Sequence, residues 1–404
     1  MQKAPKIRFD GYTEDWEHRK LSELLSFSNG FNGSKDMYGE GIPYISVMDI
    51  LSNDVITYDT IQGKVNLDER VAQRYIVEYG DILFQRSSEN IEDAGRSNVY
   101  VDTERTAVFG GFVIRGKKVS EYDPIFMKKN LETHEVRNQI TSRAQGAQHI
   151  NVGQETLGSV KAYFPSLNEQ KIIGNFFQTL DSIITLHQKE CEKMLDFKKY
   201  MLNKMFPQNG AKVPEIRFKD FTEDWEQRKF GDLGNVSMCK RIFKEQTSTE
   251  GDIPFYKIGT FGGEPDAYIT RELYEEYKEK FQYPEIGDML ISASGTIGRI
   301  VEYTGEDAYF QDSNIVWFKH DERVDNSFLK CIYAFVKWSG IEGSTIKRLY
   351  NDNFLKTEFY MPSVEEQKKI GSYFSNIDHL ITLHQRKVEA YKKMKQYMLR
   401  NMFV

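Results

Sequence analysis

One stretch of the sequence resembles a catalytic set: Pro265-Asp266, followed by Glu276-Tyr277-Lys278. Two carboxylates and a lysine in this order resemble the metal-binding residues of a nuclease. The stretch lies in a predicted helix whose counterpart in the first half, Asp68 to Tyr79, lacks it, so we interpret it as a coincidence. The Asn/Asp-Pro-Pro-aromatic motif of amino methyltransferases and the glycine-rich phosphate loop of translocases are also absent from the sequence. We therefore predict no catalytic residues and no metal site in this chain.

The elements that would position any functional residues occur as a repeat in the sequence. The segment from Pro165 to Phe206 recurs from Pro362 to Phe403 at a single offset of 197 residues, without a gap. Apolar residues in both copies alternate at spacings of four and three, which is the pattern of a coiled-coil seam. We predict two helices of roughly 35 to 40 residues, each about 55 Å long, that pack on each other as an antiparallel coiled coil. The predicted seam consists of Ile173, Phe177, Leu180, Ile184, His187, Met194, Met201, Ile370, Phe374, Ile377, Ile381, His384, Tyr391 and Met398.

Polar residues interrupt the seam at the same places in both copies, His187 with His384 and Lys198 with Lys395. Such residues cost stability but fix the register of a coiled coil. We hypothesise that the two histidines lie close together and mark a pseudo-twofold axis. The alternative, that they face water at the rim of the seam, stays open, and two histidines alone make a poor metal site.

A second repeat opens each half, because Pro5 to Lys20 returns as Pro214 to Lys229. The openings and the helices are shared while the segments between them diverge, which indicates a duplicated frame with two different middles. Each opening is predicted to be an extended piece followed by a capped helical turn, and Trp16 and Trp225 are predicted to pack against the frame. Both middles alternate short strands with helices, which predicts an α+β fold: two α/β domains with twisted sheets, separated by the two long helices and related by an internal pseudo-twofold repeat. The predicted strands cover 42–47, 81–85, 97–101, 106–114, 253–256, 287–291 and 314–318, and the predicted helices cover 121–145, 271–280 and 328–340.

The predicted boundaries divide the 404 residues into five segments. They are a first domain, 1–164, with its shared opening at 5–20; a central helix, 165–206; a linker, 207–213; a second domain, 214–361; and a terminal helix, 362–404. The linker contains Pro207 and Gly210, and Pro214 follows it directly.

Composition excludes some classes of protein and suggests a compartment. A formal charge of −6 is not the strongly basic balance of many nucleic-acid binders, although a basic face would suffice. The three cysteines show no paired spacing, and no apolar run approaches the length of a membrane span. We expect a cytoplasmic protein without a membrane partner.

Several features together resemble the specificity (S) subunit of type I restriction–modification systems, over the whole chain. They are the Ile-Arg-Phe and Thr-Glu-Asp-Trp-Glu openings, the Gly-Asp-Ile/Met-Leu segments at Gly80 and Gly287, the Pro-Ser-x-x-Glu-Gln-Lys-x-Ile-Gly entries to the long helices, and the repeated Ile-Thr-Leu-His-Gln. The resemblance implies a non-catalytic, DNA-binding subunit whose two target-recognition domains each read one half of a bipartite, asymmetric site in double-stranded DNA. It implies that the helices set the spacing between the halves and dock two methyltransferase (M) subunits, with restriction/translocase (R) subunits completing the complex. It implies no cofactor in this chain, and S-adenosylmethionine, ATP and Mg on the partner subunits.

If the resemblance holds, base contacts should come from polar and basic side chains on loops carried by the sheets. For any one residue, an ordinary solvated side chain is the simpler interpretation, so the sets are better predictions than their members. In the first domain the predicted residues are Gln85, Arg86, Ser87, Ser88, Asn90 and Arg96, and Arg143, Gln148, His149 and Asn151, with Gln145 beside them. In the second they are Lys240, Arg241, Lys244, Ser292, Ser294, Thr296, Arg299, Gln311, Asn314, Lys347, Arg348 and Asn351.

Two other functions stay open. A stand-alone DNA-binding or anti-restriction protein could use the same frame without partners. A duplicated coiled-coil scaffold could bind protein or sugar through its β-rich domains.

Overall fold

The computed structural model describes residues 4–52, 54–146, 149–208, 210–341 and 347–404. It divides into two compact units. The first combines Met1–Lys189 with Gln385–Val404, and the second is Glu190–His384. Each unit therefore contains one α/β domain, the N-terminal half of its own long helix and the C-terminal half of the other, and the predicted α+β class is confirmed.

Each shared opening ends in a strand and does not form the predicted helical turn. In the first unit, β1 (Glu17–Lys20) pairs antiparallel with β12 (Lys161–Phe164), the strand that leads into the long helix. In the second, β13 (Glu226–Lys229) pairs in the same way with β21 (Glu358–Met361). The prediction was wrong because the residues after Thr-Glu-Asp-Trp find an extended partner, whose hydrogen bonds outweigh the local capping signal.

Both units are built around a four-stranded antiparallel sheet with the same strand order. In the first unit the order is β2-β10-β6-β8, and in the second it is β14-β20-β17-β18. The bounds are β2 (Leu25–Asn29), β6 (Ile82–Gln85), β8 (Ser97–Val99), β10 (Val113–Lys118), β14 (Gly234–Ser237), β17 (Met289–Ser292), β18 (Ile300–Glu302) and β20 (Ile315–His320). The duplicated sheet confirms that the two middles share one fold.

The Gly-Asp-Ile/Met-Leu segments start the equivalent strands β6 and β17 by the same turn. Gly80 and Gly287 have φ values of +88° and +93°, which favour glycine. The next residue, Asp81 or Asp288, accepts a hydrogen bond from the backbone N–H three residues earlier, at 3.1 and 2.8 Å. Burial raises the pKa of both carboxyl groups. The turn requires these residue types, which explains why they survive the divergence of the middles.

The two units differ in a second, smaller sheet. In the first unit it has the order β4-β3-β9-β5, with β3 and β9 parallel, and in the second the strands β16-β15-β19 take its place. The bounds are β3 (Tyr38–Ile45), β4 (Gly63–Val65), β5 (Ile76–Val77), β9 (Ala107–Phe109), β15 (Ile253–Tyr256), β16 (Tyr268–Ile269) and β19 (Tyr309–Phe310). Short helices accompany these sheets: α1 (Val47–Ser52) and α2 (Glu69–Ala72) in the first unit, and α7 (Arg271–Lys280) in the second.

The helices that follow the main sheets are shorter than predicted. The prediction for 121–145 was wrong in its continuity, because the structure has α3 (Pro124–Leu131) and α4 (His134–Thr141). Thr133 interrupts them in an extended conformation, with its hydroxyl donating to the Asn130 carbonyl. The second unit has one helix here, α8 (Asn326–Tyr333), which ends well before the predicted 340. The helix predicted at 271–280 is confirmed residue for residue by α7.

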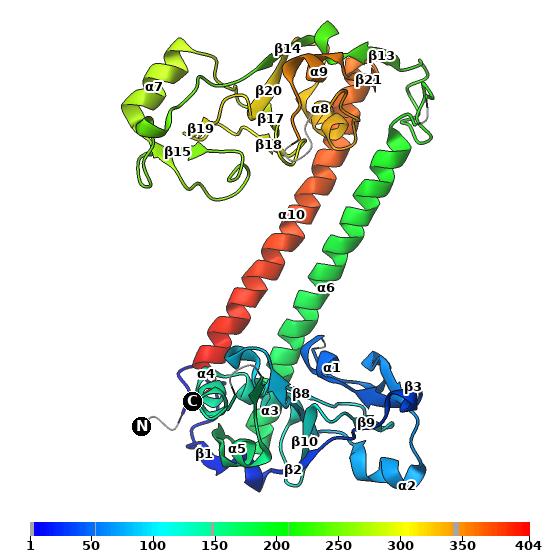
Figure 1. Ribbon diagram of the computed structural model, residues 1–404, viewed down its shortest axis with the longest axis vertical. Helices are drawn as coiled ribbons and strands as arrows, with labels where there is room; N and C mark the ends of the chain where they lie inside the picture. The colour runs from blue at the N-terminus through cyan, green and yellow to red at the C-terminus, as the bar shows by residue number, and fades with distance from the viewer. Residues whose placement is uncertain (1–3, 53, 147–148, 209, 342–346) are drawn as a thin grey trace. The chain divides into compact units, whose positions relative to one another are not determined.

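The long helices are α6 (Leu167–Met205) and α10 (Val364–Asn401), green and orange to red in Figure 1. Within the first unit they run antiparallel, since Asp181 pairs with Lys395 at 2.5 Å and, one and a half turns further along α6, His187 stacks on Tyr391. Within the second unit Lys198 pairs with Asp378 at 2.5 Å. The two ion pairs are the same pair at the repeat offset. Polar seam positions therefore bind partners across the helices in each unit.

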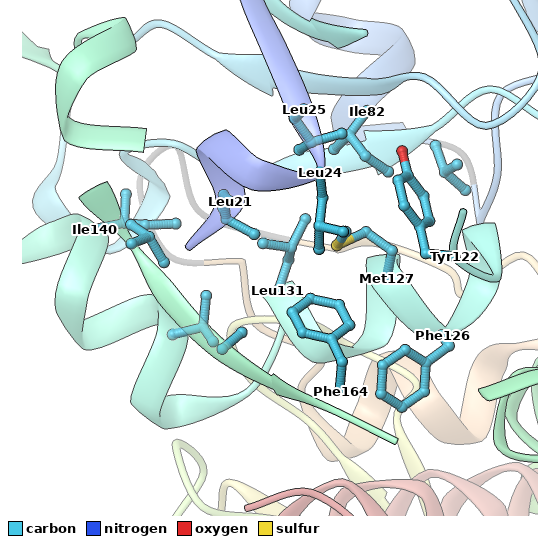
Figure 2. Close-up of a cluster of buried hydrophobic side chains, with 14 of the residues drawn as sticks. Leu21, Leu24, Leu25, Ile82, Tyr122, Phe126, Met127, Leu131, Ile140 and Phe164 are labelled. Carbon is cyan, nitrogen blue, oxygen red and sulfur yellow. The ribbon is translucent and has the colours of Figure 1, made fainter. Parts of the chain in front are cut away.

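The main core of the first unit gathers around α3. Figure 2 shows its residues from α3, β12 and the segment that follows β1, and the C-terminal Phe403 packs among them. Trp16 is 3% exposed and makes an edge contact with Phe126, and Trp225 makes the same contact with Phe328 in the second unit. The prediction that both tryptophans pack against the frame is confirmed.

A repeated closure joins the opening of each unit to the end of a long helix. The Ile7 N–H donates to the Asn401 carbonyl at 2.9 Å, and the Ile216 N–H donates to the Lys204 carbonyl at 2.9 Å. Residues 401 and 204 are equivalent in the helix repeat, so the second opening occupies on α6 the place that the first occupies on α10.

Candidate nucleic-acid interface

The main sheet of each unit places three loops at one end. In the first unit, β2 and β6 end where the antiparallel β10 begins, since Ile114 pairs with Asn29 and Val113 with Gln85. The loops that leave or enter these strands must therefore emerge together. A rigid sheet edge that carries several loops is a common support for recognition residues.

A short ladder at this edge brings the two predicted clusters of the first domain together. The strand β7 (Ser87–Ser88) pairs antiparallel with β11 (Ile150–Asn151). The Val152 N–H also donates to the Arg86 carbonyl at 2.9 Å. The segment after β6 and the segment before α5 (Gln154–Ser159) therefore form one surface.

A cleft of about 610 Å³ lies beside this ladder, and we name it the first cleft. Four of the predicted residues line it, Arg86, Arg143, Gln145 and Asn151. Its other polar side chains come from Asn29, Gln154, Glu155 and Thr156. Arg86 is half-buried and donates from Nη1 to the Gly111 carbonyl at 3.3 Å, while Arg143 reaches Ser159 Oγ at 3.1 Å. The cleft thus offers two guanidinium groups and several amides, which suit anionic and base-edge partners.

Other predicted residues of the first domain serve the local structure instead. Gln85 and Ser88 are buried, and both donate to carbonyls of the same loop. Asn90 caps the turn that contains Asp93, and Arg96 forms a 2.8 Å ion pair with the same aspartate. Ser87 contributes its backbone to the ladder, and His149 is exposed beside it, while Gln148 lies outside the described residues.

The second unit has an equivalent cleft of about 600 Å³, which we name the second cleft. It lies beside the corresponding sheet edge and the start of α9 (Asn351–Lys356), with Met238 and Ala293 in its wall. Its polar side chains come from Ser313, Arg348, Tyr350, Asn351, Asp352, Asn353 and Lys356. Ser313 has a φ of 55°, a strained value for a residue other than glycine. Of the predicted residues, Arg348 and Asn351 therefore line this cleft.

The remaining predicted residues of the second domain lie outside the second cleft. Ser292 and Ser294 are buried, Thr296 is exposed, and Arg299 donates to the Phe261 carbonyl at 2.8 Å. The basic cluster is partly engaged, with Lys240 over the Phe281 ring, Arg241 paired to Asp312 at 2.8 Å and Lys244 exposed. Gln311 accepts the Ile258 N–H, and the carbonyls of Asn314 and Lys347 accept backbone N–H groups.

Sequence reasoning missed part of both clefts. The predicted sets followed basic clusters, and most of the missed residues carry no positive charge. They are Asn29, Gln154, Glu155, Thr156, Ser313, Tyr350, Asp352, Asn353 and Lys356. A signal existed only for the entry to the long helices, where Gln154 and Asn351 stand at equivalent places before the shared Pro-Ser entries.

The frame beneath the clefts holds buried ion pairs that recur in both units. Arg8 binds Glu169 through two hydrogen bonds of 2.7 and 2.8 Å, and Arg217 binds Glu366 through two of 2.8 Å. Both carboxylates are 1% exposed. The hydrogen bond to the carboxylate raises the pKa of each arginine. These pairs tie each opening to its long helix, and the repeated Arg and Glu were the available signal.

The first unit carries a further charged group that the second lacks. Lys129 is 1% exposed and pairs with Asp181 at 2.9 Å and with Glu132 at 3.2 Å. Burial acts to raise the pKa of Glu132, but Lys128 and Lys129 outweigh it and lower the pKa to about 2. The equivalent turn of α8 has Cys331 and Ala334 in place of Lys129 and Glu132, and its one lysine, Lys330, lies 4.0 Å from Asp378.

The predicted seam residues lie in the cores of the two units. Ile173, Phe177, Leu180, Ile184, Ile370, Phe374, Ile377 and Ile381 are buried, and His187, Met194, Met201, His384, Tyr391 and Met398 are half-buried. His187 and His384 stand within two residues of the places where the unit boundary crosses α6 and α10. Their proximity stays a prediction.

The nuclease-like residues are bound to different partners. Asp266 pairs with Lys257, Glu276 pairs with Lys280, and Lys278 donates to the Tyr274 hydroxyl. Within the described part of the chain, no three His, Cys, Asp or Glu side chains converge as metal ligands. Likewise, none of the helices described here combines the length and apolarity that crossing a membrane requires.

Comparisons with known proteins follow the duplication. The family model of the type I restriction modification DNA specificity domain matches residues 13–194 and again 222–391. A type I restriction enzyme specificity subunit of Methanocaldococcus jannaschii is 23% identical and covers 95% of this chain and 91% of its own length. A specificity subunit of this type from Haemophilus influenzae is 56% identical over 153 residues, which span 38% of this chain and only 40% of the relative.

Solved structures agree with the fold. The crystal structure of a type I restriction–modification S subunit from M. genitalium matches with a TM-score of 0.64 at 15% identity, over 99% of both chains. A chain from a structural study of complex assembly in a type I system matches with a TM-score of 0.54 at 14% identity. Because the family model covers both halves of the sequence, this chain belongs to the type I restriction–modification DNA specificity family and carries the family's domain twice.

Proposed function

We propose that the chain is the sequence-reading subunit of a type I restriction–modification complex, and that each domain reads one half of a bipartite, asymmetric site in double-stranded DNA. The observation that carries this proposal is the pair of clefts. They lie at the same sheet edge of the same duplicated fold. Gln154 and Glu155 at the helix start of the first cleft match Asn351 and Asp352 in the second, whereas the side chains that line the strand ends and the ladder differ. A frame kept constant around a variable lining suits two readers of different sequences.

The long helices support the partner part of the proposal. Exposed apolar side chains recur on them at the repeat offset: Leu186 with Leu383, Phe197 with Met394, and Tyr200 with Tyr397. Large apolar side chains left exposed at repeated places mark an interaction surface. A surface that occurs once in each repeat fits two copies of one partner, and we assign it to two methyltransferase subunits. Restriction/translocase subunits would complete the complex.

The chemistry would then come from the partners. S-adenosylmethionine would bind the methyltransferase subunits, and ATP and Mg would bind the translocase subunits. This chain would contribute recognition and spacing but no catalytic residue.

The test is to express the full chain with its methyltransferase subunits and to map methylated bases in the host genome. We expect a split motif of two short defined halves. Replacing residues 21–164 by the corresponding segment of a relative should alter one half only. Adding seven residues to each long helix lengthens it by ~10 Å and should widen the gap by about three base pairs.

The two alternatives predict different results. A stand-alone DNA-binding protein would not co-purify with a methyltransferase. A scaffold for protein or sugar would show no steep fall of duplex binding with salt, which is expected for a protein that neutralises phosphates.

A further inference from the structure

The two clefts can be aligned through their backbone hydrogen bonds, independently of sequence similarity. Three bonds of the first cleft have counterparts in the second. All six are backbone N–H to carbonyl bonds of 2.7 to 2.9 Å. The bond from Gln85 to Arg96 matches that from Ser292 to Arg299, and the bond from Arg86 to Phe112 matches that from Ala293 to Asn314. The bond from Val152 to Arg86 matches that from Leu349 to Ala293. Arg86 is therefore equivalent to Ala293, and Val152 to Leu349.

The same alignment makes Asn151 equivalent to Arg348. Each precedes the aligned valine or leucine, and each faces a serine across the ladder, Ser87 in the first unit and Ser294 in the second. These two places, one on each side of the ladder, are named the strand position (Arg86 or Ala293) and the hairpin position (Asn151 or Arg348).

The arginine changes sides between the two units. In the first cleft the ladder arginine is Arg86, at the strand position and diagonal to Asn151. In the second cleft it is Arg348, at the hairpin position and diagonal to Ala293. At the strand position the backbone N–H and carbonyl are both bound within the frame. The side chains at the two positions can therefore differ without disturbing the ladder.

The neighbouring arginines do not offer this freedom. Arg96 is held by Asp93 at 2.8 Å, and Arg299 by the Phe261 carbonyl at 2.8 Å. By contrast, Arg86 makes one long hydrogen bond of 3.3 Å, which leaves most of its donors for a partner, and Arg348 is exposed. Guanidinium groups bind the O6 and N7 atoms of guanine in pairs, and the asparagine amide does the same with adenine.

We propose that the strand and hairpin positions are the specificity-determining pair of each domain. In the first domain Arg86 reads a guanine and Asn151 an adenine. In the second domain the guanine is read by Arg348, from the other side of the ladder. This inference rests on the proposed function, which it deepens by naming the readers.

The experiment uses the full chain co-expressed with its methyltransferase subunits and compares methylation motifs. With Arg86→Ala we expect discrimination at one base pair of one half-site to fall roughly 5- to 150-fold, while the other half stays unchanged. With Arg348→Ala we expect the same loss in the other half only. Arg74→Ala and Arg271→Ala, which alter exposed arginines outside the clefts, should leave both halves intact.

Two further variants keep the test decisive. Arg86→Lys retains the charge but not the paired donors, so it should relax the same base pair even where Arg86→Ala folds poorly. The double variant Arg86→Ala with Asn151→Arg gives the first cleft the pattern of the second and should change the base preference of the first half-site.

The outcomes separate the two levels of the argument. An unchanged motif in the Arg86 and Arg348 variants would overturn the assignment of readers, and so would equal weakening on every sequence, which indicates phosphate contact. In either case the split motif of the unaltered chain would leave the proposed function standing. Absence of a split motif in the unaltered chain would overturn the proposed function itself.

Discussion

The two units repeat side-chain contacts where the opening meets the long helix, but backbone hydrogen bonds at the cleft. Where each opening meets its long helix, the contacts are copied side chain by side chain: Arg8 with Glu169 matches Arg217 with Glu366. At the cleft, the backbone hydrogen bonds of the ladder are copied, whereas its side chains differ: Arg86 and Asn151 are replaced by Ala293 and Arg348. The frame therefore repeats its side-chain contacts, and the cleft repeats its backbone hydrogen bonds. Side chains in the cleft can thus change without unfolding the frame.

The largest effect on stability is expected from removing an arginine of the frame. Arg8→Ala leaves Glu169 charged and buried, and Arg217→Ala does the same to Glu366, so each should cost about 3–5 kcal/mol. Hydrogen exchange read by mass spectrometry should show lost protection in the altered unit only. The double variant Arg8→Met with Glu169→Leu should recover most of the loss, since no buried charge remains. Equal loss of protection in both units would contradict the expectation that each arginine stabilises its own unit.

A smaller effect is expected at the glycine near the start of each long helix. A Cβ at Gly371 would stand 1.8 Å from Ser327 Oγ and 2.9 Å from the Phe328 nitrogen, and one at Gly174 would stand 2.3 Å from Asp123 Oδ1. Replacement by alanine should destabilise each unit by about 1–3 kcal/mol, less the ~1 kcal/mol that alanine gains in a helix. Thermal unfolding would measure both.

The matched control for the glycines is Gly158→Ala in α5. Its Cβ would meet Ser22 Cβ at an ordinary 3.5 Å. Unfolding temperature should stay level or rise, and a fall as large as that of Gly371→Ala would mean that crowding is not the cause.

Acid sharpens the comparison, because only the first unit has Glu132 beside two lysines. Its folded pKa of about 2 lies below the ordinary glutamate value of 4.5, so the stabilisation is complete above pH 4.5 and is lost as the pH falls from about 4.5 to about 2. The side chain is 30% exposed, so we expect only about 1–2 kcal/mol. Glu132→Gln should remove this pH dependence from the first unit and leave that of the second unchanged, as followed by hydrogen exchange between pH 5 and pH 2.5.

The smallest effect is expected at the ion pairs across the helices. Lys198 and Asp378 are 26% and 29% exposed, so the pair should contribute about 0.5–1 kcal/mol. Lys198→Asp should destabilise the second unit, and adding Asp378→Lys should restore part of the loss, because the new lysine also approaches Lys330; urea denaturation would measure both. Failure of the restoration would show that the register does not depend on this pair.

The long elements were predictable and the reading surface was not. A strict repeat and a heptad pattern predicted α6 and α10 nearly to the residue, and the pattern of α7 sufficed for its ends. The pairing of β7 with β11 involves two residues on each side, too few to leave a periodic signal. That pairing decides which side chains of the predicted clusters line the cleft, so the sequence identified the segments but not the members.

The closure at the helix ends shows that docking of an opening does not need a peptide bond. Segment 5–20 contacts the end of α10 through the Ile7 hydrogen bond and the packing of Trp16 on Phe403, whereas its counterpart 214–229 is also joined to α6 through residues 207–213. The covalent joint is thus redundant for this contact. A protease that severs 207–213 should leave both fragments associated, and two genes that encode them separately should produce the same assembly.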